Sequence, residues 1–451
     1  MDLPSHAQSL TPEIDFLYKR RRGKTRLGLE STRDLLRALG SPERGVPVLH
    51  VAGTNGKGST TAMAAAILRE AGLRVGHFTS PHMLSVEERI RVDGVPITSD
   101  AFRARVREMR TRIERADASF FESVTAMAAL HFRDAGVDVA VYEVGLGGRL
   151  DSTTALPAEV TILTGVGHDH ESILGRGLGA VCREKLGIVR PGVTLHAALD
   201  DPALVRQARR HCDRVGSPLR LVPETAVRVL DLDLWSGMQF ELGDPPRCMW
   251  TRFIGRHHAR NAALACAAAA ELARERFGIV ELDPVPGLAQ ARLPGRFQVL
   301  PATDKEPLLI LDVAHNPESL QATLDVAKQL LADARPIVIL GMLRDKRLDG
   351  VVPRLESWAL GLRLTTPRVA RAWKLEEIAR RLRRRAPGLS IEVSANVGAA
   401  LDATRGTAPV LLLGSHYLVG EALPLLAARR GLTTQALLDG SAPEIAIRAA
   451  G

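Results

Sequence analysis

The sequence predicts an α/β protein of two or three domains built around mostly parallel sheets. Short apolar runs alternate along the chain with longer stretches of helical periodicity, which is the pattern of a parallel sheet covered by helices. The chain has 451 residues, 45% of them hydrophobic, so it can form more than one sizeable core. The first clear apolar run also enters a Gly-rich turn followed by a helical stretch, the order found at phosphate-binding loops.

Four strands and four helices are expected in the first part of the chain. The strands are 48–52, 138–144, 160–164 and 193–197, and the helices lie around 59–71, 100–116, 122–135 and 258–276. The last helix is so rich in alanine that it can pack closely against a sheet. Because helical stretches rather than short turns separate most of these strands, we expect them to pair in parallel.

A second alternating series begins after the segment Ala291-Arg292-Leu293-Pro294-Gly295-Arg296. Its strands are expected at 308–313, 337–340, 362–365 and 410–413, and its helices near 318–332, 350–358, 374–385 and 396–403. No strand is followed by Gly-x-Gly-x-x-Gly, so we expect no dinucleotide site. We therefore predict a P-loop ATPase-like domain over residues 1–294 and a smaller Rossmann-like α/β domain over residues 295–451, with a weakly patterned tail from residue 431.

Composition and charge exclude several classes of protein. No apolar run is long enough to span a membrane, and residues 1–24 are polar and basic, so no secretory signal is expected. The four cysteines are scattered, which argues against disulfides or a zinc site and indicates the cytoplasm. The net charge of +9 suits anionic substrates. The Arg-rich run at 380–385 lacks interleaved aromatic residues and indicates a solvated helix face, so no nucleic-acid partner is expected.

The Gly-rich turn carries the clearest chemical signal. Residues 53–60 are Gly-Thr-Asn-Gly-Lys-Gly-Ser-Thr. The glycines let the backbone approach phosphate groups, and the helix start offers free N–H groups and a positive dipole end. Lys57 can neutralise phosphate oxygens, and the Ser59 hydroxyl can ligate Mg²⁺. The spacing departs from the standard pattern because Gly58 separates the lysine from the hydroxyl residue.

Other candidate residues are ambiguous on their own. Glu143 ends a predicted strand and precedes a Gly-rich loop, a place where a carboxylate can hold Mg²⁺. His170 follows the next strand, but imidazole is not the preferred ligand of Mg²⁺. Phe120 and Phe121 are notable in a chain with 4% aromatic residues. They are equally well explained by a flat heterocyclic ligand or by a core at a helix start.

The ordered set of motifs resembles the Mur ligase superfamily of ATP-dependent acid–amino-acid ligases. Gly-Lys-Gly-Ser at 56–59 is similar to the folylpolyglutamate synthase and dihydrofolate synthase branch. Further matching blocks are Thr-Ser-Pro-His at 79–82, Glu-Arg-Ile at 88–90, Phe-Phe-Glu at 120–122, Glu-Val-Gly-Leu-Gly-Gly-Arg-Leu-Asp at 143–151, Asp-His at 169–170, Glu-Lys at 184–185, His-His-x-x-Asn at 257–261, Pro-Gly-Arg at 294–296, Asp-Val-Ala-His-Asn-Pro at 312–317 and Gly-Ser-His-Tyr-Leu-Val-Gly-Glu at 414–421. Each block is weak alone, but the ordered series is specific.

The resemblance implies a role for each block. It assigns ATP to Thr54, Asn55, Gly56, Lys57, Gly58, Ser59, Asn261, Arg296 and Asp312, and metal ions to Ser59, Glu143 and His170, with two Mg²⁺ sites and a monovalent cation. It assigns a dihydropteroate or folate acceptor to Ser80, Pro81, His82, Phe120, Phe121, Glu122, Leu150, Asp151, Ser152 and Ser415. His315 would border the site of L-glutamate, and Lys57, Lys185 and His315 would be the catalytic residues.

The family's Glu-Lys block contains a lysine carbamylated by CO₂, which implies a carbamate on Lys185. A neutral amine attacks CO₂, and the product carries an anion on a long stem that can ligate or orient Mg²⁺. Leu186 and Arg190 replace the usual Ala and Lys without changing the reactive position. Other departures are His168, which lies outside the usual pattern, His258 for Gln, Val313 for Gly and His416 for Leu.

The reaction that the resemblance implies is ATP-dependent addition of L-glutamate to a carboxylate through an acyl phosphate, in a monomer whose domains close about Pro294 and Gly295. Two alternatives remain open. One is a ligase of the cell-wall branch, which Gly58, the Thr-Ser-Pro-His loop and the Phe-Phe-Glu block disfavour. The other is a P-loop nucleotide switch without ligase activity, which has no need of the second metal site or of Lys185.

Overall fold

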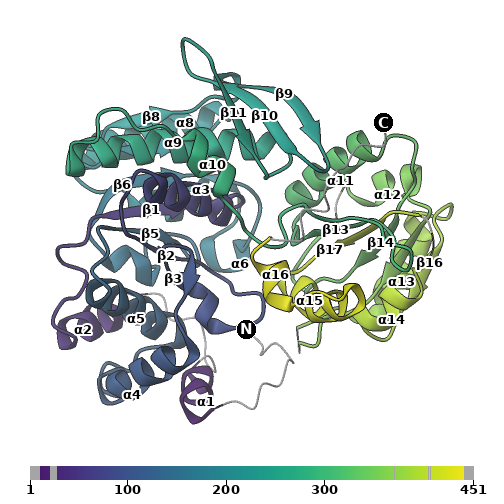
Figure 1. The fold of residues 1–451 in the computed structure, drawn as a ribbon, viewed down its shortest axis with the longest axis horizontal. Helices are drawn as coiled ribbons and strands as arrows, with labels where there is room; N and C mark the ends of the chain where they lie inside the picture. The colour runs from purple at the N-terminus through teal and green to yellow at the C-terminus, as the bar shows by residue number, and fades with distance from the viewer. Residues whose placement is uncertain are drawn as a thin grey trace.

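The computed structural model describes residues 11–20, 28–348, 350–369, 371–404, 406 and 408–440. Over these residues the strands form an eight-stranded sheet, a three-stranded sheet and a six-stranded sheet, with helices packed around them (Figure 1). The predicted α/β class with mostly parallel sheets is confirmed. Residues 1–10 and 21–24 of the basic N-terminal stretch and residues 441–451 of the predicted tail lie outside the described residues.

The large sheet has the order β4-β3-β2-β5-β1-β6-β7-β8 and is parallel except at β2–β3 and β3–β4. Its strands are β1 (Val48–Ala52), β2 (Val75–Phe78), β3 (Ile90–Val92), β4 (Val95–Pro96), β5 (Val139–Glu143), β6 (Ala158–Leu163), β7 (Leu195–Ala197) and β8 (Leu219–Leu221). Strand β1 lies between β5 and β6 and is buried throughout. Its carboxyl end therefore opens the phosphate loop at the middle of the sheet.

Helices cover both faces of this sheet because its strands alternate between two cores. Leu49 and Val51 face one core with α3 (Lys57–Glu70) and α9 (Arg256–Phe277), whereas Val48 faces the other. The second core contains α1 (Pro12–Lys19), α2 (Glu30–Ala38), α4 (Ser99–Arg115) and α5 (Phe120–Asp134). The remaining helices before the chain crossing are α6 (Glu171–Leu174), α7 (Leu178–Lys185), α8 (Pro202–Val215) and α10 (Val285–Gln290).

The three-stranded antiparallel sheet was not predicted. It consists of β9 (Val227–Asp233), β10 (Gly237–Leu242) and β11 (Arg247–Thr251) and projects above α9 and α10 in Figure 1. Met238 and Phe240 are fully buried in the same core as α9. This sheet thus extends the α9 side of the first core rather than the parallel sheet.

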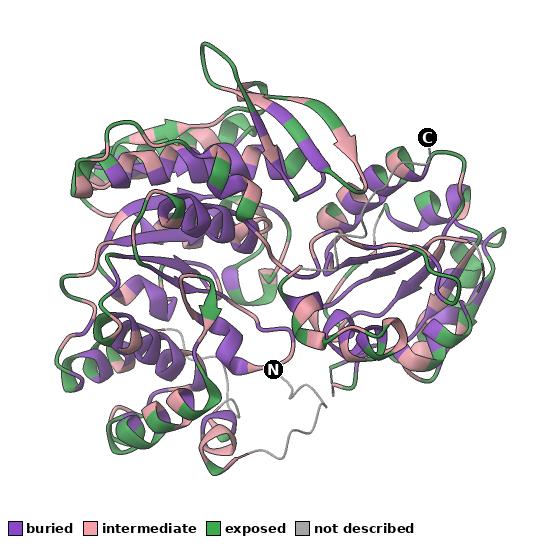
Figure 2. Ribbon diagram, viewed as in Figure 1, coloured by how far each residue is buried: buried purple, intermediate pink, exposed green. Residues whose placement is uncertain are grey.

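The six-stranded sheet has the order β12-β13-β17-β14-β15-β16, and only β12 is antiparallel to its neighbour. Its strands are β12 (Gln298–Leu300), β13 (Leu309–Asp312), β14 (Ile337–Leu340), β15 (Gly361–Leu364), β16 (Ile391–Val393) and β17 (Val410–Leu413). The helices are α11 (Pro317–Leu331), α12 (Val352–Trp358), α13 (Leu375–Arg385), α14 (Val397–Asp402), α15 (His416–Arg430) and α16 (Thr434–Leu438). Figure 2 shows a buried centre in each of the two large sheets.

The described residues up to Gln290, at the end of α10, form the first part of the molecule, and those from Gln298, at the start of β12, form the second part. The chain crosses between the two parts in the connection from α10 to β12, and the predicted boundary at 294/295 lies within this connection. Helix α13 buries Ala379 and Leu382 and exposes all five of its arginines, in agreement with a solvated face. None of the helices in the described ranges is both long and apolar enough to cross a membrane.

Candidate active site at the phosphate loop

The loop after β1 has the backbone that a phosphate-binding turn requires. Gly56 precedes α3 with a φ of 83°, a left-handed conformation that favours glycine. A Cβ at this position would lie 2.7 Å from Asn261 Oδ1, which shows how closely the Asn261 side chain of α9 approaches the loop. The helix start at Lys57 and the Asn261 amide, predicted from separate motifs, are thereby brought to one place.

Two lysines meet at the carbonyl oxygen of Gly53. Lys57 Nζ donates to it at 3.1 Å and to Thr54 O at 3.2 Å, and Lys185 Nζ donates to the same Gly53 oxygen at 2.6 Å. Burial and then the positive charge of Lys57 lower the pKa of Lys185 to about 7. Burial also lowers the pKa of Lys57, although Glu143 and Asp169 oppose the change. A substantial fraction of Lys185 is therefore a neutral amine near neutral pH.

Ser59 and Glu143 are both suited to a hard divalent cation. The Ser59 hydroxyl is buried and has no hydrogen-bond partner among the described residues. Glu143 is also buried, and its Oε2 accepts a hydrogen bond from Ser80 N at 3.0 Å. Burial raises the pKa of Glu143, whereas the charges of Lys57 and Arg296 lower it. An unsatisfied hydroxyl beside a desolvated carboxylate matches the oxygen ligands that Mg²⁺ prefers.

His170 stands in a strained position, with a φ of 54°. Its Nε2 lies 3.8 Å from Asp169 Oδ1, and burial together with nearby cations lowers its pKa to about 4, so the imidazole is neutral, as a metal ligand must be. Among the described residues, no group of three or more His, Cys, Asp and Glu side chains has an arrangement that could hold a metal ion by itself. The protein thus supplies an incomplete ligand set, which phosphate oxygens and water normally complete for Mg²⁺.

Asp169 connects the first part of the molecule to the second. Its carboxylate contacts Lys346 Nζ at 2.6 Å, His315 Nε2 at 3.4 Å and Asn316 Nδ2 at 3.5 Å. Burial alone raises the pKa of Asp169, but the hydrogen bond from His315 and the charges of His170 and Lys346 hold it well below its usual range. Sequence reasoning missed Lys346, although it follows strand β14, at whose carboxyl end ligand-binding residues are common in parallel sheets.

The second part of the molecule also touches the phosphate loop directly. Asn316 Nδ2 donates to Asn55 Oδ1 at 2.9 Å, and the amide N–H of His168 donates to Glu318 Oε1 at 3.1 Å. Asn316 and Glu318 belong to the N-terminal cap and first turn of α11. The polar groups at this helix start therefore lie against the loop on which a nucleotide phosphate would rest.

Arg296 and Asp312 lie where the chain crosses between the two large sheets. Asp312 Oδ2 accepts from Phe297 N and its Oδ1 accepts from Ala314 N, both at 2.7 Å. Burial lowers the pKa of the Arg296 guanidinium, and the carboxylates of Asp312 and Glu143 oppose that change. Asp312 thus fixes the backbone beside Arg296, and a charged guanidinium lies near Glu143 in the same site.

The substitution His258 for Gln has a packing explanation. The His258 ring is buried 5.2 Å from the ring centroid of Phe253 and 4.1 Å from that of His257. Burial holds the pKa of His258 well below its usual range, so this ring is neutral. His258 therefore lies on the buried side of α9 against Phe253, whereas the side chain of Asn261, one turn further along the same helix, approaches the phosphate loop.

The two adjacent phenylalanines of α5 point to different surroundings. Phe120 is buried and stacks on Tyr18 with ring centroids 5.4 Å apart. Phe121 is half-buried and lies over Gly145, where an added Cβ would come within 2.4 Å of its ring. Phe121 thus borders the Gly-rich loop that follows Glu143, whereas Phe120 packs in the core.

Several residues that the resemblance assigns to the acceptor are engaged locally. Glu122 Oε2 accepts from Ser119 N at 2.6 Å in the capping box of α5, Asp151 accepts from Leu146 N and Thr153 N, and Ser415 Oγ accepts from Tyr417 N at the start of α15. His82 Nδ1 accepts from Arg89 Nε at 2.9 Å. Ser152 is buried and Leu150 half-buried in the same loop as Asp151.

A cavity of about 620 Å³ reaches the phosphate loop from the side of α3. At its inner end it is lined by Gly58, Ser80, Pro81, Glu143, Arg296 and His416. It is lined from both parts of the molecule, because Arg69 and Arg91 belong to the first and Leu438 to helix α16. A carboxylic acid that enters this cavity can therefore reach the groups around Lys57 and Glu143.

Comparison with known proteins covers both parts of the chain. The Mur ligase middle domain matches residues 51–269, and the Mur ligase glutamate ligase domain matches residues 295–416. The dihydrofolate synthase/folylpolyglutamate synthase of Escherichia coli is 32% identical over 95% of this chain and 98% of its own length. Mycobacterium tuberculosis folylpolyglutamate synthase, solved with ADP and AMPPCP, superimposes with a TM-score of 0.81 at 29% identity, over 92% of this chain and 98% of that one. A bifunctional folylpolyglutamate synthase/dihydrofolate synthase solved with Mn, AMPPNP and L-glutamate bound gives a TM-score of 0.77 at 28% identity, over 92% of this chain and 98% of that one.

Proposed function

The chain belongs to the dihydrofolate synthase/folylpolyglutamate synthase family of Mur ligases, and from this premise we propose that it joins L-glutamate to the carboxylate of dihydropteroate, of folates or of both at the expense of ATP. The observation that best supports this function is the geometry of the phosphate loop. Lys57 and Lys185 donate to the same carbonyl oxygen, that of Gly53. The same site contains Glu143 and the Ser59 hydroxyl, which has no hydrogen-bond partner in the part of the chain that the structure describes. ATP and a divalent metal are the cofactors, as in the related structures.

The first step transfers the γ-phosphoryl group from ATP to an oxygen of the acceptor carboxylate, which gives ADP and an acyl phosphate. Lys57 and Arg296 would stabilise the negative charge on the moving phosphoryl oxygens, a role that the closeness of both charges to Glu143 supports. Ser59, Glu143 and His170 would hold the divalent metal, which when bound neutralises phosphate charge. The cavity lined by Ser80, Glu143 and Arg296 gives the acceptor its approach.

The second step is attack of the glutamate amine on the acyl carbon. A C–N bond forms, the C–O bond to phosphate breaks, and the amine loses a proton to yield the amide. His315 would border the glutamate, and its Nδ1 already hydrogen-bonds Val313 O at 2.9 Å, which fixes the ring. Acyl phosphates hydrolyse in water, so the contacts of Asn316 and Glu318 with the loop also serve to exclude solvent.

The last part of the proposal is that Lys185 carries a carbamate. Addition of CO₂ to its neutral amine forms an N–C bond and releases one proton, leaving an anion close to the phosphate loop. The support is its burial and its pKa of about 7. The carbamate would replace a positive charge that repels a bound cation by a negative charge that attracts it.

We further propose that residues 1–294 and 295–451 act as two domains of a cytoplasmic monomer. The two large sheets are built from strands on either side of the connection at 291–297. The scattered cysteines support a reducing compartment. The substrates are ATP, L-glutamate and the pterin acid, with no nucleic acid.

A substrate panel tests this function. Purified protein would be given ATP, Mg²⁺ and L-glutamate with dihydropteroate, a folate monoglutamate or a nucleotide-linked muropeptide acid, and ADP release would be measured with and without glutamate. We expect release that requires both glutamate and a pterin acid. Turnover with the muropeptide acid alone would assign the cell-wall branch, and hydrolysis independent of glutamate would assign a nucleotide switch.

A further inference from the structure

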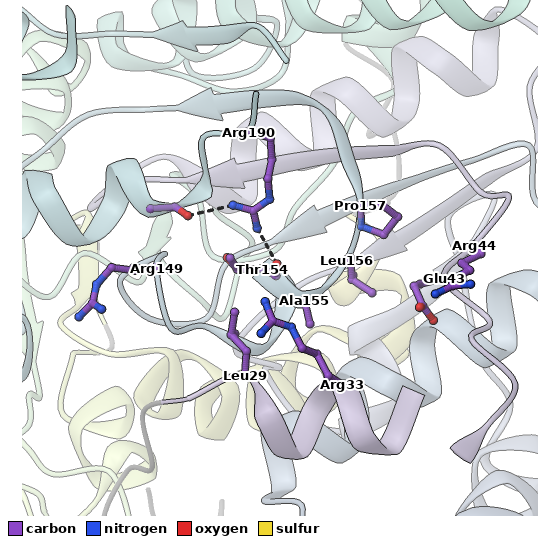
Figure 3. Close-up of a pocket in the computed structure, with 11 residues that line it drawn as sticks. Leu29, Arg33, Glu43, Arg44, Arg149, Thr154, Ala155, Leu156, Pro157 and Arg190 are labelled. Atoms are coloured by element: carbon purple, nitrogen blue, oxygen red, sulfur yellow. Dashed lines mark hydrogen bonds between the residues drawn. The ribbon is translucent and has the colours of Figure 1, made fainter. Parts of the chain in front are cut away.

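A second pocket, separate from the phosphate loop, has four arginines in its lining. It has a volume of about 450 Å³ and lies between α2, the short 3₁₀ helix η2 (Ser152–Ala155) and the chain after α7 (Figure 3). Its charged residues are Arg33, Arg44, Arg149, Arg190 and Glu43. Glu43 and Arg44 precede β1, whereas the phosphate loop follows β1, so that end of the pocket and the loop are separated by the strand, roughly 15 Å of extended chain.

The positive charge of this pocket is largely uncompensated. Among the described residues, no hydrogen bond or ion pair engages the guanidinium groups of Arg33 or Arg44. The Arg190 guanidinium donates only to the carbonyl oxygens of Gly187, Val189 and Thr154. Arg149 alone has a carboxylate, Glu184, at 2.9 Å. Four guanidinium groups therefore line a pocket that contains one carboxylate.

Two of the arginines are held close enough to repel each other. Figure 3 shows Arg33 and Arg190 directed toward Thr154 and Ala155 from opposite sides of the pocket. Burial and then the charge of Arg33 lower the pKa of Arg190. Like charges held close to each other cost free energy, and an anion between them would remove that cost. Guanidinium forks recognise phosphate and carboxylate oxygens in the same bidentate way.

We propose that this pocket is a binding site for a small anion that carries two or more negative charges on phosphate or carboxylate oxygens. The anion lies between Arg33 and Arg190, and Arg149 and Arg44 add to the attraction. Glu43 stands beside Arg44 at the other end (Figure 3), and within the described ranges its buried Oε2 has no hydrogen-bond partner. That oxygen is an acceptor for an N–H or O–H group on the same ligand, which disfavours anions without a donor.

The test is a titration of full-length protein whose phosphate loop is already saturated with AMPPNP and Mg²⁺. Inorganic phosphate and, separately, L-glutamate and glutarate would be titrated into the wild type, Arg33→Gln and Arg37→Gln, with heat as the readout. Arg37 lies on the same helix and pairs with Asp34 outside the pocket, so it is the matched control. We expect Arg33→Gln to weaken binding about tenfold, the effect of losing one charge-assisted hydrogen-bonded group, and Arg37→Gln to bind as the wild type.

The separate titrations with phosphate, glutamate and glutarate show which class of anion the pocket binds. Binding of phosphate alone would indicate a phosphorylated ligand, whereas binding of glutarate or glutamate would indicate a polycarboxylate. If Glu43 accepts a hydrogen bond from the amino group of glutamate, glutamate should bind more tightly than glutarate. Equal binding by wild type and Arg33→Gln, absence of binding to the wild type, or binding that disappears when AMPPNP fills the loop would each overturn the proposal. Arg33 is exposed, so its replacement leaves the fold intact, and a circular dichroism spectrum checks this.

Discussion

A single backbone oxygen, that of Gly53, receives two ammonium groups at the phosphate loop. The oxygen fixes the position of both Lys57 and Lys185 and keeps two positive charges together in the absence of nucleotide. Burial reduces the repulsion between them, because it lowers the pKa of Lys185 to about 7 and leaves a substantial fraction of that amine neutral near neutral pH. The two lysines therefore depend on each other, and changing one changes the chemistry of the other.

We predict that Lys57→Ala abolishes nearly all turnover while leaving the protein folded. Loss of a group that stabilises charge on a transferring phosphoryl typically costs 10²-fold or more in rate, roughly 3 kcal/mol or more. Because Lys57 contributes to the lowered pKa of Lys185, the same variant should also raise the pKa of Lys185. ADP release measures the first effect and NMR titration of a labelled lysine amine the second. Turnover like that of the wild type in a folded Lys57→Ala protein would contradict the assignment of the loop.

The carbamate on Lys185 gives a prediction about pH. Only the neutral amine adds CO₂, and burial lowers the pKa of Lys185 from 10.5 to about 7. At a fixed concentration of dissolved CO₂, occupancy should therefore rise between about pH 6 and pH 8, whereas an ordinary lysine would require about pH 10. ¹³C NMR with labelled CO₂ measures the occupancy directly.

Activity should follow that occupancy. It should fall when CO₂ and bicarbonate are removed and recover when they are returned, and Lys185→Ala should be nearly inactive with partial rescue by short carboxylic acids. A carbamate signal that persists in Lys185→Ala would place the modification on another residue. Activity that does not depend on CO₂ would show that the carbamate has no role in the reaction.

At the scale of elements, helix α5 offers a matched pair of substitutions. Phe120 packs under Tyr18 and Phe121 lies over Gly145. We predict that Phe120→Ala lowers the free energy of unfolding by about 3–5 kcal/mol, as a buried phenylalanine does. Phe121→Ala should instead weaken binding of the pterin acid much more than binding of ATP, because its half-buried ring borders the loop after Glu143.

Chemical denaturation and separate titrations of the two ligands decide between these roles. Each variant is the control for the other, since both remove the same ring from adjacent residues of one helix. Equal loss of affinity for both ligands in Phe121→Ala, with a large loss of stability, would return Phe121 to the core.

The sequence predicted those elements whose residues are buried on both faces. Strands 48–52, 337–340 and 410–413 have the predicted bounds because each is a continuous aliphatic or nearly aliphatic run buried between helices. Strand β9 was missed because it is only partly covered and alternates between half-buried and exposed residues, a pattern without an apolar run. Strand β2 was also not predicted, because it contains Gly76 and His77, neither of which favours a strand by itself.

The site was predictable only where its residues follow strands of one sheet. Lys57 follows β1, Glu143 ends β5 and His170 follows β6. These three strands are neighbours in the sheet, so their carboxyl ends meet. The capping roles of Glu122 and Ser415 depend on backbone geometry that the motifs do not specify. Lys346 was missed because it is 177 residues from its partner Asp169, and nothing in the sequence alone sets how the two large sheets face each other.

At the scale of the whole molecule, a buried ion pair between Asp169 and Lys346 joins the two parts. The side chains are only 10% and 7% exposed, and the atoms are 2.6 Å apart. Breaking a buried pair by removing one partner costs about 3–5 kcal/mol because the remaining charge is left unpaired. The pair should withstand mild acid, because the pKa of Asp169 is held well below its usual range and its stabilisation is lost only as the pH falls through that value.

We predict that Lys346→Met loosens the two parts of the molecule and lowers kcat/KM at least about tenfold, the effect of roughly 1.4 kcal/mol. Cleavage by trypsin in the connection around Arg292 and Arg296 measures the loosening, and steady-state kinetics measures the rate. Lys328→Met is the control, because Lys328 is exposed on α11. Cleavage and kinetics equal to those of Lys328→Met would show that the pair contributes nothing to the arrangement.

The contacts of Asn316 and Glu318 with the phosphate loop also set a physical limit on the speed of the catalytic cycle. We expect a spent nucleotide to leave the loop only when the start of α11 moves away from it, so each turnover would include one separation of the two parts through the surrounding liquid. Such a movement is resisted by solvent friction, whereas bond making is not. Raising the viscosity with sucrose should therefore lower kcat in proportion, while a macromolecular thickener that leaves microscopic friction unchanged should not.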